Sequence, residues 1–204
     1  MQQKIFEPIN IKNRLIPNRL CAQAMEGNDC ENGGQPSERT INRYKQYADG
    51  KWGLVHIEAT SIIETSLARV NGMIINKKNL DSIKRLVDAF RKYDKESLLI
   101  IQITHSGERS GSFSDIVTIT PGTLPCNKTG PRYLSTEDIE RIRDRFIEGG
   151  LLTEQAGIDG IDIKMCHGYL GGEMLRPTNT RDDGWGGSFE NRTRFLREIV
   201  QGDL

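Results

Sequence analysis

The chain has 204 residues, enough for one large domain or two small ones, and 36% of them are hydrophobic, as in ordinary globular proteins. Lysine plus arginine and aspartate plus glutamate both number 28, so the formal net charge is zero and weighs against binding to a nucleic-acid backbone. The longest apolar run, residues 98–101, is too short to cross a bilayer, and residues 1–4 lead into no apolar signal segment.

The four cysteines are widely spaced and form no Cys-x-x-Cys pair; they are Cys21, Cys30, Cys126 and Cys166. Because zinc and iron–sulfur ligands usually come in such pairs, no metal site is expected. Four cysteines are also too few for a disulfide scaffold. We therefore interpret them as reduced thiols of a cytoplasmic protein.

The first half of the chain alternates between short apolar runs and helical periodicity. Residues 5–19 mix apolar residues with turn formers, which predicts a hairpin, and residues 20–25 predict a strand. After a loop over 27–36, Ser37 is typical of a helix cap, and the helix is expected to end near Gly50. A buried strand is predicted over 54–60 and a second amphipathic helix over 80–90.

The second half continues the same alternation. A third strand is predicted over 98–104, followed by a long loop over 106–134 that is rich in Gly, Ser, Thr and Pro. Ser135 opens a helix in which Asp138 takes the acidic position of a capping box. A fourth strand is predicted over 160–166, and a fourth helix begins near Phe189.

Alternating strands and helices predict a parallel sheet with right-handed crossovers, which closes as a doubly wound sheet or a (β/α)8 barrel. No Gly-x-Gly-x-x-Gly follows the first strand, and long loops follow the strands, so the barrel is favoured. A barrel typically needs about 250 residues. We expect its first half, about four β/α units with an N-terminal hairpin, so that residues 1–204 are the N-terminal portion of one domain whose C-terminal half is absent.

Polar residues gather where each predicted strand ends, at Met25-Glu26, Glu58-Thr60, Gln102-His105 and Lys164-His167. In a barrel these carboxyl ends converge on the active face. The alternative is that any strand becomes polar as it leaves the core, and the periodicity alone does not decide between the two.

Several ordered motifs resemble the old yellow enzyme family of FMN-dependent oxidoreductases, over essentially all of the chain. The segments Phe6–Ile9 and Asn18–Leu20 are similar to that family's hairpin and first strand. Tyr44–Thr60 and Gln102–Arg109 are similar to its second and third units. The most specific similarity lies in the last third of the chain, in the segments His167–Leu170, Arg176–Arg181 and Gly186–Phe195.

The resemblance implies FMN as cofactor and NAD(P)H as reductant. It implies that the Gln102 carboxamide, which can donate and accept together, binds the pyrimidine edge of the flavin. Main-chain groups of five residues would meet the N5 and O4 side of the ring: Ala24, Met25, Glu26, Ala59 and Thr60. The family commonly has proline at the position of Ala24, and threonine or cysteine at that of Glu26, so the role of Glu26 is left open. His105 is expected to be structural.

The resemblance also implies a catalytic group in the fourth-strand segment. Lys164 and His167 occupy the positions of two side chains that hydrogen-bond a substrate carbonyl, usually His followed by His or Asn. An ammonium at Lys164 suits a developing enolate, and it also suits a substrate carboxylate. Tyr169 matches a tyrosine that donates a proton to the substrate carbon. The ordinary alternatives are an ion-paired Lys164 and a packing role for Tyr169.

The function expected from this resemblance is an NAD(P)H-dependent ene reductase acting on activated alkenes. One alternative is a relative of the amine dehydrogenase and dienoyl-CoA reductase branch, whose members carry an iron–sulfur motif further along the chain. Another is a truncated or inactive half-barrel that acts as an interaction module. The expected partner is a small-molecule substrate, with no nucleic acid and no membrane, and self-association is left open.

Overall fold

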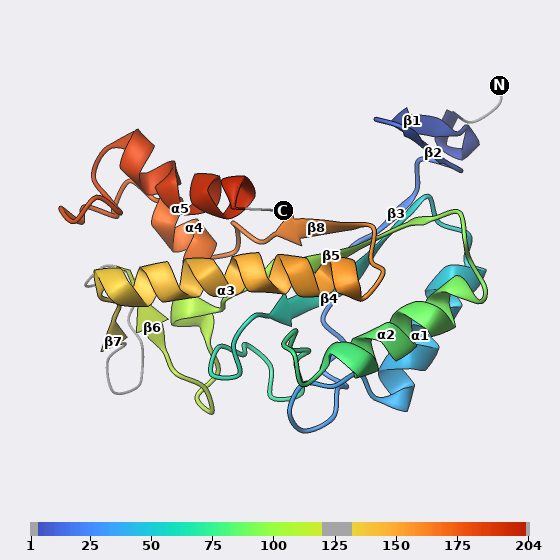
Figure 1. Ribbon diagram of the computed structural model, residues 1–204, viewed down its shortest axis with the longest axis horizontal. Helices are drawn as coiled ribbons and strands as arrows, with labels where there is room; N and C mark the ends of the chain where they lie inside the picture. The colour runs from blue at the N-terminus through green and yellow to red at the C-terminus, as the bar shows by residue number, and fades with distance from the viewer. Residues whose placement is uncertain (1–3, 120–131, 203–204) are drawn as a thin grey trace. The chain divides into compact units, whose positions relative to one another are not determined.

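The computed structural model describes residues 4–119 and 132–202, which form two compact units (Figure 1). The first unit comprises residues 4–60, 71–102 and 152–162. The second comprises 61–70, 103–119, 132–151 and 163–202. The units are described one at a time. Cys126 lies outside the described residues.

The first unit opens with the predicted hairpin. A 3-10 turn, η1 (Lys4–Phe6), precedes strands β1 (Ile9–Ile11) and β2 (Arg14–Ile16), which pair antiparallel with Ile9 opposite Ile16. Lys12 at the turn has a φ of 51°, the left-handed conformation that tight hairpin turns require. The hairpin expected over residues 5–19 is confirmed.

A four-stranded sheet follows in the order β3-β4-β5-β8. Its strands are β3 (Cys21–Ala22), β4 (Leu54–Ser61), β5 (Leu98–Thr104) and β8 (Gly160–Ile163). β3 and β4 run parallel, with Cys21 opposite Leu54. The two outer strands are shorter than the predicted 20–25 and 160–166, because an outer strand has a neighbour on one side only and its backbone leaves the ladder early.

Two amphipathic helices of the first unit lie side by side, α1 (Glu38–Asp49) and α2 (Leu80–Arg91) (Figure 1). Ser37 caps α1 as predicted: its hydroxyl accepts from Thr40 N at 3.1 Å, and Thr40 Oγ1 accepts from Ser37 N at 3.2 Å. The apolar faces are buried, with Tyr44 of α1 and Phe90 of α2 fully enclosed. On β4, Val55 and Ile57 are also fully buried.

The second unit contains η2 (Gly107–Arg109), the parallel pair β6 (Val117–Thr118) and β7 (Arg132–Tyr133), α4 (Leu170–Leu175) and α5 (Phe189–Gln201). It also holds most of α3 (Thr136–Gln155), whose last turn belongs to the first unit. The rings of Phe146, Trp185 and Phe195 form its aromatic core, with two edge-to-face contacts at 5.7 and 6.5 Å.

The capping box predicted at the start of α3 is confirmed, because Asp138 N donates to Ser135 Oγ and Ser135 N donates to Asp138 Oδ2, both at 3.2 Å. The predicted loop over 106–134 contains β6 and β7, and the loop after the fourth strand contains α4, neither of which the sequence indicated. Within the described residues, no helix is long and apolar enough to cross a membrane.

Candidate active site

The residues predicted to meet the N5 and O4 side of the flavin lie in the first unit, beyond β3 and at the end of β4. Met25 has a side chain 67% exposed, and Ala24 and Glu26 are half-buried beside it. Ala59 and Thr60 are buried, and the Thr60 hydroxyl donates to the carbonyl of Glu58 at 2.8 Å. Because that hydroxyl is engaged within its own strand, a role for Thr60 falls to its main chain.

Gln102, predicted to bind the pyrimidine edge, is half-buried near the end of β5. Its Nε2 donates to Asp162 Oδ2 on β8 at 2.7 Å. The same carboxylate oxygen lies 3.8 Å from His56 Nε2 on β4, and His56 Nδ1 lies 3.5 Å from the Cys21 sulfur on β3. One polar side chain from each strand of the sheet therefore contributes to a single row, Cys21–His56–Asp162–Gln102.

Sequence reasoning did not assign Asp162 or His56 to a site. The available signal was position: each is a polar residue inside a short apolar strand, and Asp162 stands between Ile161 and Ile163. A charged residue in such a strand has to face either solvent or a polar partner, and here it faces Gln102 and His56.

Arg43 organises a second polar cluster in the first unit. Its Nη2 lies 2.8 Å from Asp29 Oδ1 and 3.3 Å from Glu58 Oε1, and Glu58 also accepts from Gly27 N. Burial raises the pKa of Glu58, although Arg43 opposes the shift. Asp29 and Glu58 approach Cys30 with the spacing of metal ligands, but one guanidinium pairs with both carboxylates, which makes the cluster an ion-pair network.

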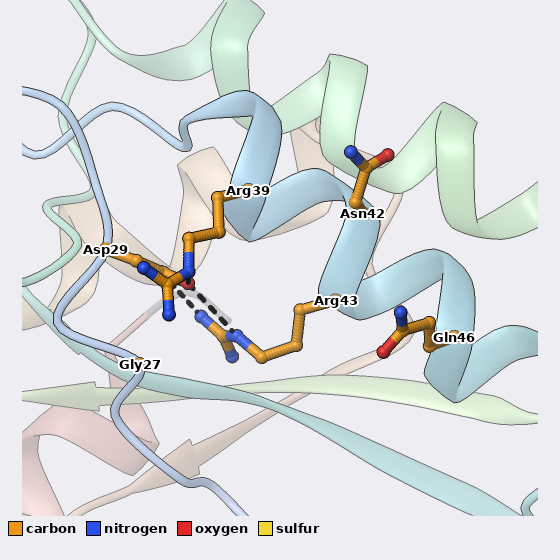
Figure 2. A pocket seen from close by; sticks show the side chains of 6 residues that line it. All are labelled: Gly27, Asp29, Arg39, Asn42, Arg43 and Gln46. Atoms are coloured by element: carbon orange, nitrogen blue, oxygen red, sulfur yellow. Dashed lines mark hydrogen bonds and ion pairs between the residues drawn. The ribbon is translucent and has the colours of Figure 1, made fainter.

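A hollow of about 570 Å³ lies beside this cluster, and Figure 2 shows the guanidinium groups of Arg39 and Arg43 directed toward Asp29. The hollow is lined by Gly27, Asp29, Arg39, Asn42, Arg43 and Gln46. Its two cations already face a carboxylate, so the hollow presents little unbalanced charge. None of the predicted site residues lines it.

The predicted catalytic residues lie in the second unit, in the turn after β8. Lys164 is buried, with 7% of its surface exposed, and its ammonium nitrogen lies 3.9 Å from the centroid of the Tyr169 ring. Tyr169 is half-buried and immediately precedes α4. The structure thus brings these two predicted residues together in a cation–π contact.

His167, the third predicted catalytic residue, lies between Lys164 and Tyr169 in the sequence, and its side chain is exposed. Its φ is 56°, and Gly168 follows with a φ of 72°, so two successive residues are left-handed. A residue with a Cβ pays about 1–3 kcal/mol for such a conformation unless its surroundings hold it there. Strained residues of this kind concentrate at functional sites, which agrees with the position predicted for His167.

Two buried acid–base groups of the second unit support its loops. Burial lowers the pKa of His105 to about 3, so the imidazole is neutral, and its Nδ1 accepts from Gly107 N at 3.1 Å. Glu173 of α4, which the sequence did not single out, accepts from Glu108 N at 2.9 Å and Thr118 Oγ1 at 2.8 Å. Both groups hold backbone in place, which fits the structural role expected for His105.

Comparison with known proteins identifies the family. The model of the NADH:flavin oxidoreductase / NADH oxidase family matches residues 4–202. The chain belongs to this family. FMN is the family's cofactor, and the resemblance to old yellow enzymes inferred from the sequence motifs is confirmed.

A curated NADPH dehydrogenase from Clostridium acetobutylicum is 34% identical over 97% of this chain, which covers 59% of that protein. The chain therefore spans about three fifths of this relative. Among solved structures, 2-naphthoyl-CoA reductase in complex with 2-naphthoyl-CoA superposes with a TM-score of 0.91 at 28% identity, over 99% of this chain and 33% of that one.

An old yellow enzyme homologue from Zymomonas mobilis superposes with a TM-score of 0.84 over 98% of this chain and 59% of that protein. At 24% identity this match concerns the fold alone. Together with the strand order, it confirms the expectation of a partial (β/α)8 barrel over the doubly wound alternative.

Proposed function

We propose that residues 1–204 form the N-terminal portion of a single FMN-binding (β/α)8 domain, in an NAD(P)H-dependent flavin oxidoreductase that reduces activated alkenes. The observation that carries the proposal is the turn after β8, where a buried ammonium contacts the ring of Tyr169 and His167 is exposed. Family membership and the NADPH dehydrogenase relative support the redox chemistry and the reductant.

The residues of the first unit fit a flavin. Within the described part of the chain, the carboxamide oxygen of Gln102 accepts no hydrogen bond, so it is available to a ring N–H. Main-chain groups of Met25 and Thr60 are assigned to the N5 and O4 side, with Ala24, Glu26 and Ala59 beside them. When bound, FMN supplies the hydride-transfer chemistry that side chains lack.

The residues of the second unit are assigned to the substrate. Lys164 and His167 donate hydrogen bonds to a substrate carbonyl oxygen and stabilise the negative charge that develops there. The described residues place no carboxylate within ion-pair distance of the Lys164 ammonium, so its charge is available to a ligand. Tyr169 holds at its hydroxyl the proton that the alkene carbon receives.

The test is stopped-flow absorbance of the FMN-loaded complete domain that carries residues 1–204, which follows flavin reduction by NADPH and reoxidation by 2-cyclohexenone separately. Loss of one preorganised donor costs about 2.7–4 kcal/mol, so His167→Ala is expected to slow reoxidation by roughly a hundredfold or more. Tyr169→Phe keeps the ring and removes the proton, so it slows alkene protonation. The control is Tyr133→Phe at an exposed tyrosine of β7, which leaves both phases unchanged.

Unchanged reoxidation in both site variants would overturn the mechanism. Lys164→His then separates the two substrate classes. If enone turnover is kept or raised, Lys164 acts on a carbonyl oxygen. If enone turnover is poor in both the parent chain and the variant, while a carboxylate-bearing alkene is reduced only by the parent, Lys164 binds the carboxylate.

A second candidate function is that of a relative of the amine dehydrogenase and dienoyl-CoA reductase branch, the alternative given in the sequence analysis. The TM-score of 0.91 to 2-naphthoyl-CoA reductase, of which this chain covers 33%, favours it. Its substrates would be conjugated acyl thioesters, and turnover of such a thioester in preference to 2-cyclohexenone would select it. A cytoplasmic location and self-association remain predictions.

A further inference from the structure

Asp162 is the one member of the row Cys21–His56–Asp162–Gln102 that contacts two others through a single oxygen. Its Oδ2 accepts from Gln102 Nε2 at 2.7 Å and lies 3.8 Å from His56 Nε2. The Asp162 side chain is 35% exposed, whereas that of His56 is 12% exposed and anchored near the carbonyl of Ala22 at 3.2 Å. His56 of β4 therefore lies beside the carboxylate, while Asp162 Oδ2 accepts its hydrogen bond from Gln102.

A carboxamide can be turned by 180° with almost no change in shape, which exchanges its oxygen and its nitrogen. An ionised carboxylate only accepts hydrogen bonds, so a carboxamide beside it must present its nitrogen. Asp162 thereby selects one of the two orientations of Gln102. In that orientation the carboxamide oxygen is turned away from Asp162, and one N–H remains for another partner.

The remaining groups of Gln102 are one acceptor and one N–H donor on a single plane. An imide presents the complementary set, an N–H flanked by two carbonyl oxygens. The pyrimidine ring of an isoalloxazine has this edge. A reversed carboxamide would place its donor against the imide N–H and lose the match.

We propose that Asp162 is a positioning residue that fixes the Gln102 carboxamide for recognition of an imide N–H, and so gives the flavin site its selectivity for the unsubstituted pyrimidine edge. This inference rests on the proposed function, because it takes Gln102 as the flavin contact. It adds a residue on β8 to a binding role that otherwise stops at β5.

The test compares two ligands that differ only at this N–H. Riboflavin and 3-methylriboflavin are titrated with the complete domain that carries residues 1–204, and dissociation constants are read from flavin fluorescence. The parent chain is expected to bind riboflavin roughly tenfold more tightly, since the methyl group removes the donor and blocks the edge. Gln102→Ala removes the carboxamide, so the ratio of its two dissociation constants is expected to be near one.

Asp162→Ala is expected to lower the ratio of the two dissociation constants by roughly two- to tenfold, because the carboxamide is no longer preorganised. Asp162→Asn can present either its oxygen or its N–H to Gln102, so it no longer selects one orientation and is also expected to lower the ratio, whereas Asp162→Glu keeps an acceptor-only carboxylate and is expected to retain it in part. Asp88→Asn, at an exposed aspartate of α2, leaves it unchanged. If Asp162→Ala does not fold, as judged by circular dichroism, Asp162→Leu removes the acceptor with similar volume.

If Asp162 had a merely structural role, Asp162→Ala would weaken the binding of both flavins equally and leave the ratio of their dissociation constants unchanged. That result would overturn the inference, while riboflavin binding by the parent would stand. A parent chain that binds neither ligand, or binds both equally, overturns the assignment of Gln102 in the proposed function and this inference with it. A lowered ratio in Asp162→Ala and Asp162→Asn, together with a ratio partly retained in Asp162→Glu, supports the positioning role.

Discussion

Lys164 is a charged side chain that the fold buries against an aromatic ring. Its ammonium lies 3.9 Å from the Tyr169 centroid, and no carboxylate of the described residues lies within ion-pair distance. A cation–π contact contributes about 0.5–2 kcal/mol, less than the several kcal/mol that desolvating an ammonium costs. Retaining the charge here is therefore unfavourable for folding, which is the pattern of a residue kept for binding or catalysis.

The variant Lys164→Met tests whether the buried ammonium of Lys164 destabilises the folded chain. Methionine keeps much of the apolar stem and removes the charge, so the free energy of unfolding is expected to stay level or rise by about 1 kcal/mol. Urea denaturation followed by circular dichroism measures it, with Lys84→Met on α2 as the control. A loss of more than about 2 kcal/mol would show instead that the ammonium is a structural group.

At the residue scale, the catalytic roles that the sequence motifs imply for Lys164, His167 and Tyr169 stay predictions. The motif around Lys164 and His167 indicated which side chains surround the turn after β8, and the structure adds the contact of Lys164 with Tyr169. The partners Asp162 and Glu173 were missed, because their roles depend on residues about 60 positions away in the chain. Residue type and spacing carry no record of such long-range pairings.

At the scale of elements, the sequence predicted those helix ends that are stabilised by interactions between residues close together in the chain. The caps at Ser37 and Ser135 were readable because each involves residues three positions apart. α4 was not, since its first turn contains Gly171 and Gly172, which disfavour helix. It forms because Leu170 is buried and its N–H donates to the carbonyl of His105 at 3.1 Å, a tertiary contact.

Glu173 connects α4 to two other elements of the second unit, and its replacement should reveal that connection. The carboxylate accepts from Glu108 N beside η2, and from Thr118 Oγ1 and Ile119 N at β6. In Glu173→Gln one oxygen becomes a donor, which leaves a buried N–H without an acceptor. Unfolding by urea is expected to become easier by about 2–3 kcal/mol.

Glu140→Gln, on α3 and half-buried, is the matched control and should change the free energy of unfolding by less than about 0.5 kcal/mol. Equal stability of Glu173→Gln and the parent chain would mean that the three donors find other acceptors, and that Glu173 does not organise these loops.

At the scale of the whole molecule, arginine–carboxylate pairs set the response to acid. Hydrogen bonds from Arg181 and Thr136 lower the pKa of Asp183 to about 2. Burial acts to raise the pKa of Asp29 and Glu198, but arginine partners bring both below their usual values. Burial raises the pKa of Glu58 and Glu173, which acts in the opposite direction.

The lowered groups contribute stability above their unfolded pKa, near 4, and this contribution is lost as the pH falls through the folded value. The raised carboxyls of Glu58 and Glu173 favour folding at low pH and lose that contribution as the pH rises. Since the lowered carboxylates are more numerous, and since the buried neutral imidazole of His105, with its pKa lowered to about 3, must gain a proton, the free energy of unfolding is expected to fall as the pH drops from about 6 to about 2, measured by urea titrations at each pH. Asp183→Asn should flatten this decline because residue 183 no longer titrates, whereas Asp182→Asn, at the exposed neighbouring residue, should reproduce the parent curve. An acid decline as steep in Asp183→Asn as in the parent chain would show that Asp183 does not contribute to it.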